Sequence, residues 1–182
     1  MKWYVLQVMT GSERDVCTAL RRKGVQARAP AQRMEIRRRG QWQTEERLLL
    51  PGYVFVGVDY SAALFHVVSP VYGVIRWLGL HCGEPQALDA REALRWRLDS
   101  EETLKPSRVL FHEDGTWHVL DGPLAAFEGC PVRMERRGGG GGVEKTVRME
   151  RRQRRAYVTA ELGGIARRVR FGVIPVTEGS GP

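Results

Sequence analysis

The segment KWYVLQVM (2–9) is an apolar and aromatic run near the start of the chain. A run of this kind predicts a central β-strand that is covered on both faces. The segment TGSERDVCTALRRKG (10–24) follows it and has apolar residues at helical spacing. Ser12 can cap this helix and Gly24 can end it. The first 24 residues therefore predict a buried strand that leads into an amphipathic helix.

Strand and helix patterns continue to alternate as far as residue 100. The predicted elements are a polar hairpin at 26–50 with its tip at RRRGQ (37–41), a strand at 53–58, a helix at 59–69, a strand at 73–80 and a helix at 89–100 that Asp89 caps. This order is typical of a ferredoxin-like α+β sandwich. We assign residues 1–100 to that domain.

The chain changes character after residue 100. Residues 101–115 are polar and contain Pro106, which predicts an interdomain linker. Beyond it lie five short strand-like runs with no helix between them: WHVLDGPL, EGCPVRME, RAYVTAEL, ARRVRF and VIPV. Five short strands in about sixty residues favour a small β-barrel. We assign residues 116–178 to this second domain.

The net charge of +8 and the isoelectric point near 9.9 indicate a polyanionic partner. Residues 122–182 carry twelve Lys and Arg against six Asp and Glu, whereas residues 1–121 carry seventeen against fifteen. A solvated basic face is the simpler interpretation of this cluster. The uneven distribution also favours nucleic-acid contact by the C-terminal part.

Other features narrow the class of protein. The three cysteines are far apart and form no CxxC motif, so a disulfide framework or a zinc site is not expected. No signal peptide and no run of about 18 apolar residues is recognised, and we expect no membrane association. We expect a reduced, cytoplasmic, monomeric protein.

The hexapeptide VRMERR occurs at 132–137 and again at 147–152, on either side of five consecutive glycines. Removal of residues 138–152 restores an uninterrupted strand-turn-strand pattern. We therefore interpret this segment as an insertion at a hairpin tip of the barrel. One interpretation is a tolerated duplication, because the entropic cost of closing a loop grows only slowly with its length. The other is a basic arm on a flexible glycine tether.

Several motifs together resemble the NusG family of transcription elongation factors. The N-terminal part of the resemblance rests on KWYVLQVMTGSERDV, LLLPGYVFV and GVIRWLG, and the C-terminal part, which resembles the family's KOW domain, rests on HVLDGPLAAFEG and RRAYVTAELGGIARRVRF. The resemblance covers residues 2–100 and 116–176. It implies an N-terminal domain that binds RNA polymerase and bridges its DNA cleft, and an SH3-like KOW barrel that recruits a further partner.

The resemblance also implies functional residues. The polymerase-binding surface of the family falls on Tyr53 and Phe55, with Trp77 and Leu80 from the neighbouring strand as further candidates. The alternative is that all four side chains belong to the core, because aromatic residues in strands usually do.

The C-terminal domain departs from the general pattern of the family. Elongation factors that couple to Rho or to the ribosome carry a phenylalanine in a barrel loop, where this sequence has Gly163. Loss of such an anchor weakens an interface, which argues against that coupling. Arginine, which suits forked phosphate contacts, is abundant instead. The candidate RNA-binding residues are Arg151, Arg152, Arg154, Arg155, Arg167, Arg168 and Arg170.

Because the C-terminal domain has many arginines and lacks the aromatic anchor, the chain is most similar to the LoaP subgroup. The KOW domain of that subgroup binds a hairpin of the nascent RNA. The expected function is thus antitermination, with RNA polymerase, nascent RNA and non-template DNA as partners. The alternatives are a general elongation factor with a protein partner and a free RNA-binding or ribosome-associated KOW protein. No catalytic or phosphate-loop motif is present, so we expect neither an enzyme nor a cofactor.

Overall fold

The computed structural model describes residues 1–79, 84–98, 103–127, 147–162 and 165–177. The chain has a mixed α+β fold with many strands and few helices. It divides into two compact units. The first unit comprises Met1–Pro30, Leu48–Glu102 and Glu161–Ala166, and the second comprises Ala31–Arg47, Thr103–Ala160 and Arg167–Pro182.

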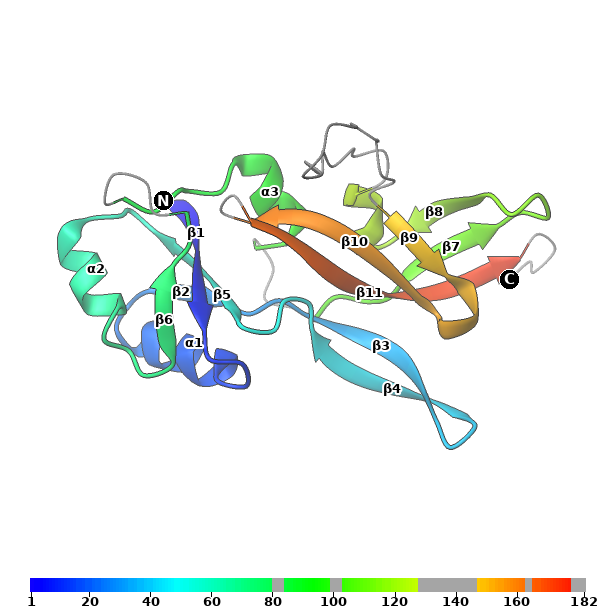
Figure 1. Ribbon diagram of the computed structural model, residues 1–182, viewed down its shortest axis with the longest axis horizontal. Helices are drawn as coiled ribbons and strands as arrows, with labels where there is room; N and C mark the ends of the chain where they lie inside the picture. The colour runs from blue at the N-terminus through cyan, green and yellow to red at the C-terminus, as the bar shows by residue number, and fades with distance from the viewer. Residues whose placement is uncertain (80–83, 99–102, 128–146, 163–164, 178–182) are drawn as a thin grey trace, which may run out of the picture. The chain divides into compact units, whose positions relative to one another are not determined.

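The first unit contains a four-stranded antiparallel sheet (Figure 1). Its order is β2 (Gln26–Arg28), β5 (Tyr53–Val58), β1 (Lys2–Val8) and β6 (Val74–Trp77). The predicted central position of the first strand is confirmed, since β1 pairs with both β5 and β6. The strand predicted at 53–58 has the predicted bounds, and all six of its residues are buried.

One face of this sheet packs against α1 (Glu13–Arg22) and α2 (Ala62–Val68). Side chains alternate along a strand, so Val54, Val56 and Val58 of β5 point to this face. They join a core with Val16 and Leu20 of α1. The amphipathic pattern that predicted α1 therefore corresponds to the surface that the helix buries.

The start of α1 differs from the prediction. Ser12 occupies the N-cap position, but its side chain makes no capping hydrogen bond. The buried carboxylate of Glu13 instead joins the start of the helix to neighbouring loops, since it accepts hydrogen bonds from the backbone N–H of Gly11 at 2.8 Å and of Gly52 at 2.6 Å. An acidic group at the first turn also suits the helix dipole.

The opposite face of the sheet packs against the segment of α3 (Ala90–Arg95). Asp89 caps α3 as predicted, and Glu92 completes a capping box. Just after the helix, the ring of Trp96 lies 5.8 Å from the ring of Phe55. The two faces of the sheet thus carry two separate sets of packed side chains.

The second unit contains a five-stranded sheet of order β8-β7-β11-β10-β9. The strands are β7 (Ser107–Phe111), β8 (Trp117–Asp121), β9 (Val147–Glu150), β10 (Arg155–Leu162) and β11 (Ile165–Thr177). β11 pairs in parallel with β7, and the other pairs recorded for the sheet, β7 with β8 and β9 with β10, are antiparallel. The sheet has five strands, but they are not the five segments predicted from the sequence, and the closed KOW barrel stays a prediction.

The structure corrects the assignment of three segments. Residues 107–111, predicted to lie in a linker, form β7, because the short apolar stretch SRVLF can pair with two neighbours. The last two predicted strands form one long strand, β11. The strand next to β10 begins at Val147 and so comes from the second copy of VRMERR. The strand predicted from EGCPVRME and the glycine run lie outside the described residues.

The hairpin predicted at 26–50 forms as β3 (Ala31–Arg38) and β4 (Gln41–Leu48). Its two-residue turn consists of Arg39 and Gly40, with φ values of 50° and 84°. Positive φ at both positions is what a tight hairpin turn requires, and the predicted tip is correct. The hairpin belongs to the second unit, however, and not to the N-terminal unit in which the sequence analysis placed it.

Candidate nucleic-acid interface

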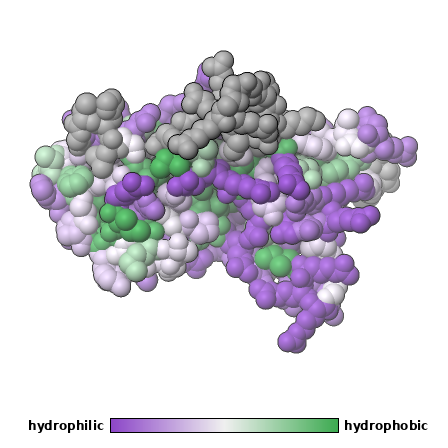
Figure 2. Space-filling view, viewed as in Figure 1, coloured by the Kyte–Doolittle hydropathy of each residue, from purple (hydrophilic) through white to green (hydrophobic). Residues whose placement is uncertain are grey.

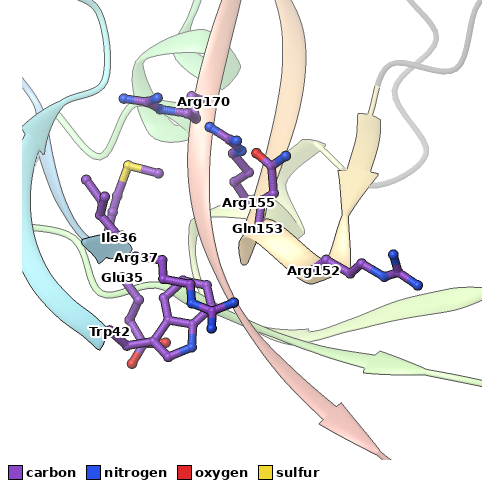
Figure 3. Close-up of a pocket in the computed structure, with 9 residues that line it drawn as sticks. Glu35, Ile36, Arg37, Trp42, Arg152, Gln153, Arg155 and Arg170 are labelled. Carbon is purple, nitrogen blue, oxygen red and sulfur yellow. The ribbon is translucent and has the colours of Figure 1, made fainter. Parts of the chain in front are cut away.

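A pocket of about 400 Å³ lies in the second unit, between the hairpin β3–β4 on one side and the turn at Arg151–Gln153, β10 and β11 on the other (Figure 3). It is lined by Met34, Glu35, Ile36, Arg37, Trp42, Arg152, Gln153, Arg155 and Arg170. Four of these are arginines and one is glutamate. We call this hollow the arginine pocket.

A hydrogen bond from a backbone N–H to a buried side chain joins β3 and β11, which form two sides of the arginine pocket. The buried Gln32 of β3 accepts a hydrogen bond from the N–H of Gly172 in β11 at 2.8 Å. Gly172 has no side chain to keep the strands apart: a Cβ there would lie 3.2 Å from the carbonyl oxygen of Arg33. A side chain at this position would therefore require the backbone of β3 to move by a few tenths of an ångström.

The turn before β10 sets the direction of the arginines. A 3₁₀ turn at Arg151–Gln153 follows β9, and Arg154 then adopts a left-handed conformation with φ of 50°. The carbonyl of Arg154 accepts a hydrogen bond from the N–H of Val173 at 2.8 Å. The rare conformation is thus fixed by a bond to β11, and it separates Arg152 from Arg155.

Arg154 contacts two residues of the hairpin. Its guanidinium forms an ion pair with Glu35 of β3 and lies over the ring of Trp42 in β4, 4.2 Å from the ring centre. Both contacts join the β9–β10 turn to the hairpin. Because Glu35 neutralises Arg154, the carboxylate does not offset the charge of the other arginines that line the pocket.

The other predicted RNA-binding residues fall into two groups. Arg155 is paired with Glu150 at 3.0 Å, Arg168 lies over the ring of Tyr157 at 3.9 Å, and Arg151 lies over Phe111 at 5.1 Å. Arg152 and Arg170 are exposed and have no ion pair or ring contact with any residue that the structure describes.

The three candidate arginines of β11 point to two different faces of the strand. Arg167 shares a face of β11 with the buried Val169 and Phe171, whereas Arg168 and Arg170 point to the other face. The arginine pocket thus gathers Arg152, Arg155 and Arg170, with Arg154 beside it. Arg151, Arg167 and Arg168 do not line it.

Sequence reasoning missed the contribution of the hairpin. Arg37 and Trp42 line the arginine pocket, and Figure 2 shows a largely hydrophilic surface over the hairpin. The basic tip RRRGQ was visible in the sequence, but its association with β10 and β11 was not. On β4 of the same hairpin, the hydrogen bond from Arg38 lowers the pKa of Glu45, with a further contribution from Arg47.

Three of the four residues predicted to bind polymerase are buried in the first unit. Tyr53 is 8% exposed, Phe55 0% and Trp77 2%. Trp77 pairs with Leu6 of β1 and so lies on the α1–α2 face, opposite Phe55. Leu80 lies outside the described residues. The three described side chains therefore form no common surface patch, and their contact with polymerase stays a prediction.

Metal sites and membrane-spanning helices are two further features that bear on the class of protein. In the part of the chain that the structure describes, no cluster of His, Cys, Asp or Glu side chains has the arrangement of a metal site. No helix in that part has the length and apolar character needed to cross a bilayer.

Comparison with known proteins identifies the family. A family model described as transcription termination factor nusG matches residues 1–97. The transcription termination/antitermination protein NusG of Pseudomonas aeruginosa is 31% identical over 140 residues, which cover 70% of this chain and 78% of the relative. NusG of Escherichia coli K12 is 30% identical over 145 residues, which cover 74% and 80%.

A solved structure described as domain interaction in Thermotoga maritima NusG is 21% identical, with a TM-score of 0.46, and the match covers 94% of this chain and 93% of that chain. The family model spans more than half of the chain, and the relatives match most of their own length. The chain therefore belongs to the NusG family of transcription termination/antitermination proteins.

Proposed function

We propose that this protein is an antitermination factor that binds RNA polymerase through residues 1–100 and nascent RNA through the arginines of its second unit. Membership of the NusG family supports a role in transcription, and the names of the relatives include antitermination. Contact with RNA polymerase and with non-template DNA is implied by the sequence resemblance. The same resemblance favours a specialised factor of the LoaP type.

The observation that carries the RNA-binding proposal is the arginine pocket. Arg155 and Arg170 come from adjacent strands and meet the hairpin at one hollow. Guanidinium groups form forked, charge-assisted hydrogen bonds with phosphate oxygens. A concave surface with several arginines concentrates positive potential, which attracts a polyanion.

A general elongation factor with a protein partner on the second unit is the alternative. It is favoured by the curated relatives at about 30% identity, which carry the general NusG name. The sequence argues against it at Gly163, where an aromatic anchor is missing. RNA binding by the purified chain distinguishes the two functions.

The test is the salt dependence of RNA binding by the full-length chain, with a nascent leader transcript as the probe. Each neutralised phosphate adds roughly 0.7–0.9 to the magnitude of the log–log slope. The double variant Arg152→Ala/Arg170→Ala removes two exposed arginines without an ion-pair partner in the described structure, and it should reduce the slope by roughly 1.4–1.8.

The matched control is Arg22→Ala/Arg91→Ala, which removes two exposed charges from helices of the first unit. It should leave the slope within about 0.3 of the wild-type value if RNA contact is local to the second unit. An affinity that does not change with salt would refute RNA binding and favour the protein-partner alternative. An equal loss of slope in both double variants would refute the assignment to the arginine pocket.

A further inference from the structure

Trp42 is the unusual member of the arginine pocket. It lies on β4, one residue after the strand begins, and retains 36% of its surface exposed. The neighbours Gln41 and Gln43 are exposed as well, so this part of β4 contributes little to a core. An exposed indole at the rim of a basic hollow suits contact with a ligand better than contact with the interior.

The structure fixes the orientation of this indole. The guanidinium of Arg154 lies over the Trp42 ring at 4.2 Å from its centre, and Glu35 holds that guanidinium in turn. A cation over an aromatic face stabilises this geometry by about 0.5–1 kcal/mol at an exposed site. The ring is therefore held in place before any ligand arrives, which lowers the entropic cost of stacking on it.

Arginines lie at both ends of the arginine pocket, and Trp42 lies at one of them. Figure 3 shows Arg155 and Arg170 extending from β10 and β11 at one end of the hollow, with Trp42 and Arg37 at the other. The apolar side chains of Met34 and Ile36 also line it. An aromatic platform flanked by arginines is the usual composition of a site for single-stranded nucleic acid.

The size of the hollow restricts the ligand. Its volume of about 400 Å³ lies at the lower end of the range for small-ligand pockets, which is roughly 300–1,000 Å³. One base with its sugar and phosphate is of that order, whereas a duplex keeps its bases stacked inside the helix. The hollow therefore suits an unpaired nucleotide.

We propose that the arginine pocket binds one unpaired RNA nucleotide, whose base stacks on Trp42 while Arg155 and Arg170 contact the adjacent phosphates. This inference rests on the proposed RNA-binding function and adds the hairpin β3–β4 to the RNA site. Glu35 and Arg154 are positioning residues, since they orient Trp42. The site recognises an unpaired segment of RNA, such as a loop or a bulge.

The experiment compares two probes on the full-length chain: a 12-nucleotide oligoadenylate and an abasic ribose-phosphate oligomer of the same length. Both carry the same phosphates, but only the first can stack. Loss of stacking on one base corresponds to a weakening of about 5- to 150-fold. Trp42→Ala should weaken oligoadenylate binding by a factor in this range and leave both abasic-oligomer binding and the salt slope unchanged.

Two variants serve as controls. Trp42→Phe keeps an aromatic face and should retain most of the affinity for oligoadenylate. Tyr72→Ala removes a side chain that is 83% exposed in the first unit, and it should change neither probe's affinity. Ultraviolet cross-linking of the wild-type chain to oligoadenylate gives a measurement that does not depend on how a variant folds, and its adduct should fall on the peptide that contains Trp42.

The outcomes separate the inference from the proposed function. Three outcomes would overturn the stacking site while leaving RNA binding intact. Trp42→Ala weakens the binding of both probes equally, or it leaves the affinity for oligoadenylate unchanged, or the cross-links fall only on other peptides. Failure of the wild-type chain to bind oligoadenylate would also overturn the stacking site, whereas only absent or salt-independent binding of the leader transcript would refute the proposed function itself.

Discussion

Gln32 and Gly172 are separated by 140 residues in sequence and are joined by a direct hydrogen bond of 2.8 Å, from the backbone N–H of Gly172 to the side-chain oxygen of Gln32. The side-chain nitrogen of Gln32 donates to the carbonyl of Lys105 at 3.0 Å. Gln32 is 0% exposed. One buried amide thus connects β3 to β11 and to the segment that precedes β7.

Replacement of this amide should destabilise the second unit. Gln32→Leu keeps a similar volume but leaves the N–H of Gly172 and the carbonyl of Lys105 without their partner. Each unsatisfied buried group costs about 1–3 kcal/mol. Urea denaturation should show this loss in the free energy of unfolding. Gln43→Leu, at an exposed position on the same hairpin, is the control, and equal stability of the two variants would contradict the anchoring role.

Gly122 should be more sensitive to substitution than another glycine of the same unit. Its φ is +97°, and a Cβ there would lie 2.6 Å from the Cα of Ser107. Gly115 has a φ of +83°, but a Cβ there would meet no atom within 4 Å, so Gly115→Ala introduces backbone strain without a clash. The strain alone costs about 1–2 kcal/mol.

Gly122→Ala should therefore lower the free energy of unfolding by clearly more than Gly115→Ala does, because the backbone of β7 must move as well. Thermal unfolding of the two variants gives the comparison. A smaller effect at Gly122 would show that the close approach of the β8 turn to Ser107 is absent in solution.

Cys17 should make the free energy of unfolding depend on pH in the alkaline range. The thiol lies on the buried face of α1, and burial raises its pKa to about 11 from an ordinary value of 9.0, with a smaller opposing effect of Arg21. Well below pH 9 the thiol is protonated in both states and contributes no pH dependence. Between pH 9 and 11 the unfolded chain ionises first, so the free energy of unfolding falls as the pH rises, by about 3 kcal/mol at most.

The comparison with Cys17→Ala isolates this effect, because the remaining ionisable groups are common to both proteins. The variant should lose less stability than the wild type between pH 9 and 11. Brief alkylation of the native chain at pH 8, followed by peptide mapping, should leave Cys17 unmodified. Rapid modification of Cys17 under native conditions would show that the thiol is accessible and would contradict its raised pKa.

Phe55 tests whether the aromatic side of β5 belongs to the core. Its ring is fully buried against Trp96. Phe55→Ser should lower the free energy of unfolding by about 3–5 kcal/mol or more, since it creates a cavity and buries a hydroxyl. Circular dichroism during heating measures this. If the variant stays as stable as the wild type and only its association with core polymerase weakens, the ring is a binding residue and not a core residue.

Local patterns in the sequence predicted much of the first unit. The run at β1, the valines of β5 and the cap at Asp89 are short-range signals, and each corresponds to an element in the structure. The turn at Arg39–Gly40 follows from the tolerance of glycine for positive φ. These features depend on neighbours in sequence, which is why they could be recognised without a structure.

The arginine pocket depends on contacts that no local pattern encodes. Glu35 and Trp42 meet Arg154 only because β3 packs near β11. The sequence does not distinguish the four arginines at 151, 152, 154 and 155. In the structure they have different partners, because Arg154 adopts a left-handed conformation and pairs with Glu35. The segment 107–111 looked like a linker because its partner in the parallel pairing, β11, lies more than sixty residues later.

The repeated hexapeptide leads to the last prediction. In the structure the second copy supplies β9, whose residues Val147 and Glu150 pair with Val158 and Arg155 of β10. Deletion of 132–146, which removes the first copy and the glycine run, gives the same polypeptide as deletion of 138–152, because the two copies are identical. The same trimmed protein is therefore obtained whether the inserted residues are taken as 132–146 or as 138–152.

We expect the trimmed protein to keep the pairing of β9 with β10. Shortening a loop changes the closure free energy by only about 0.6 kcal/mol per halving of its length, so its stability should stay close to that of the wild type. The trimmed segment contains three arginines and one lysine. If it is a tolerated duplication, RNA affinity and the salt slope are retained after trimming. A slope that falls by roughly two to three units would instead show that these residues contact phosphates, and would make the insertion a basic arm.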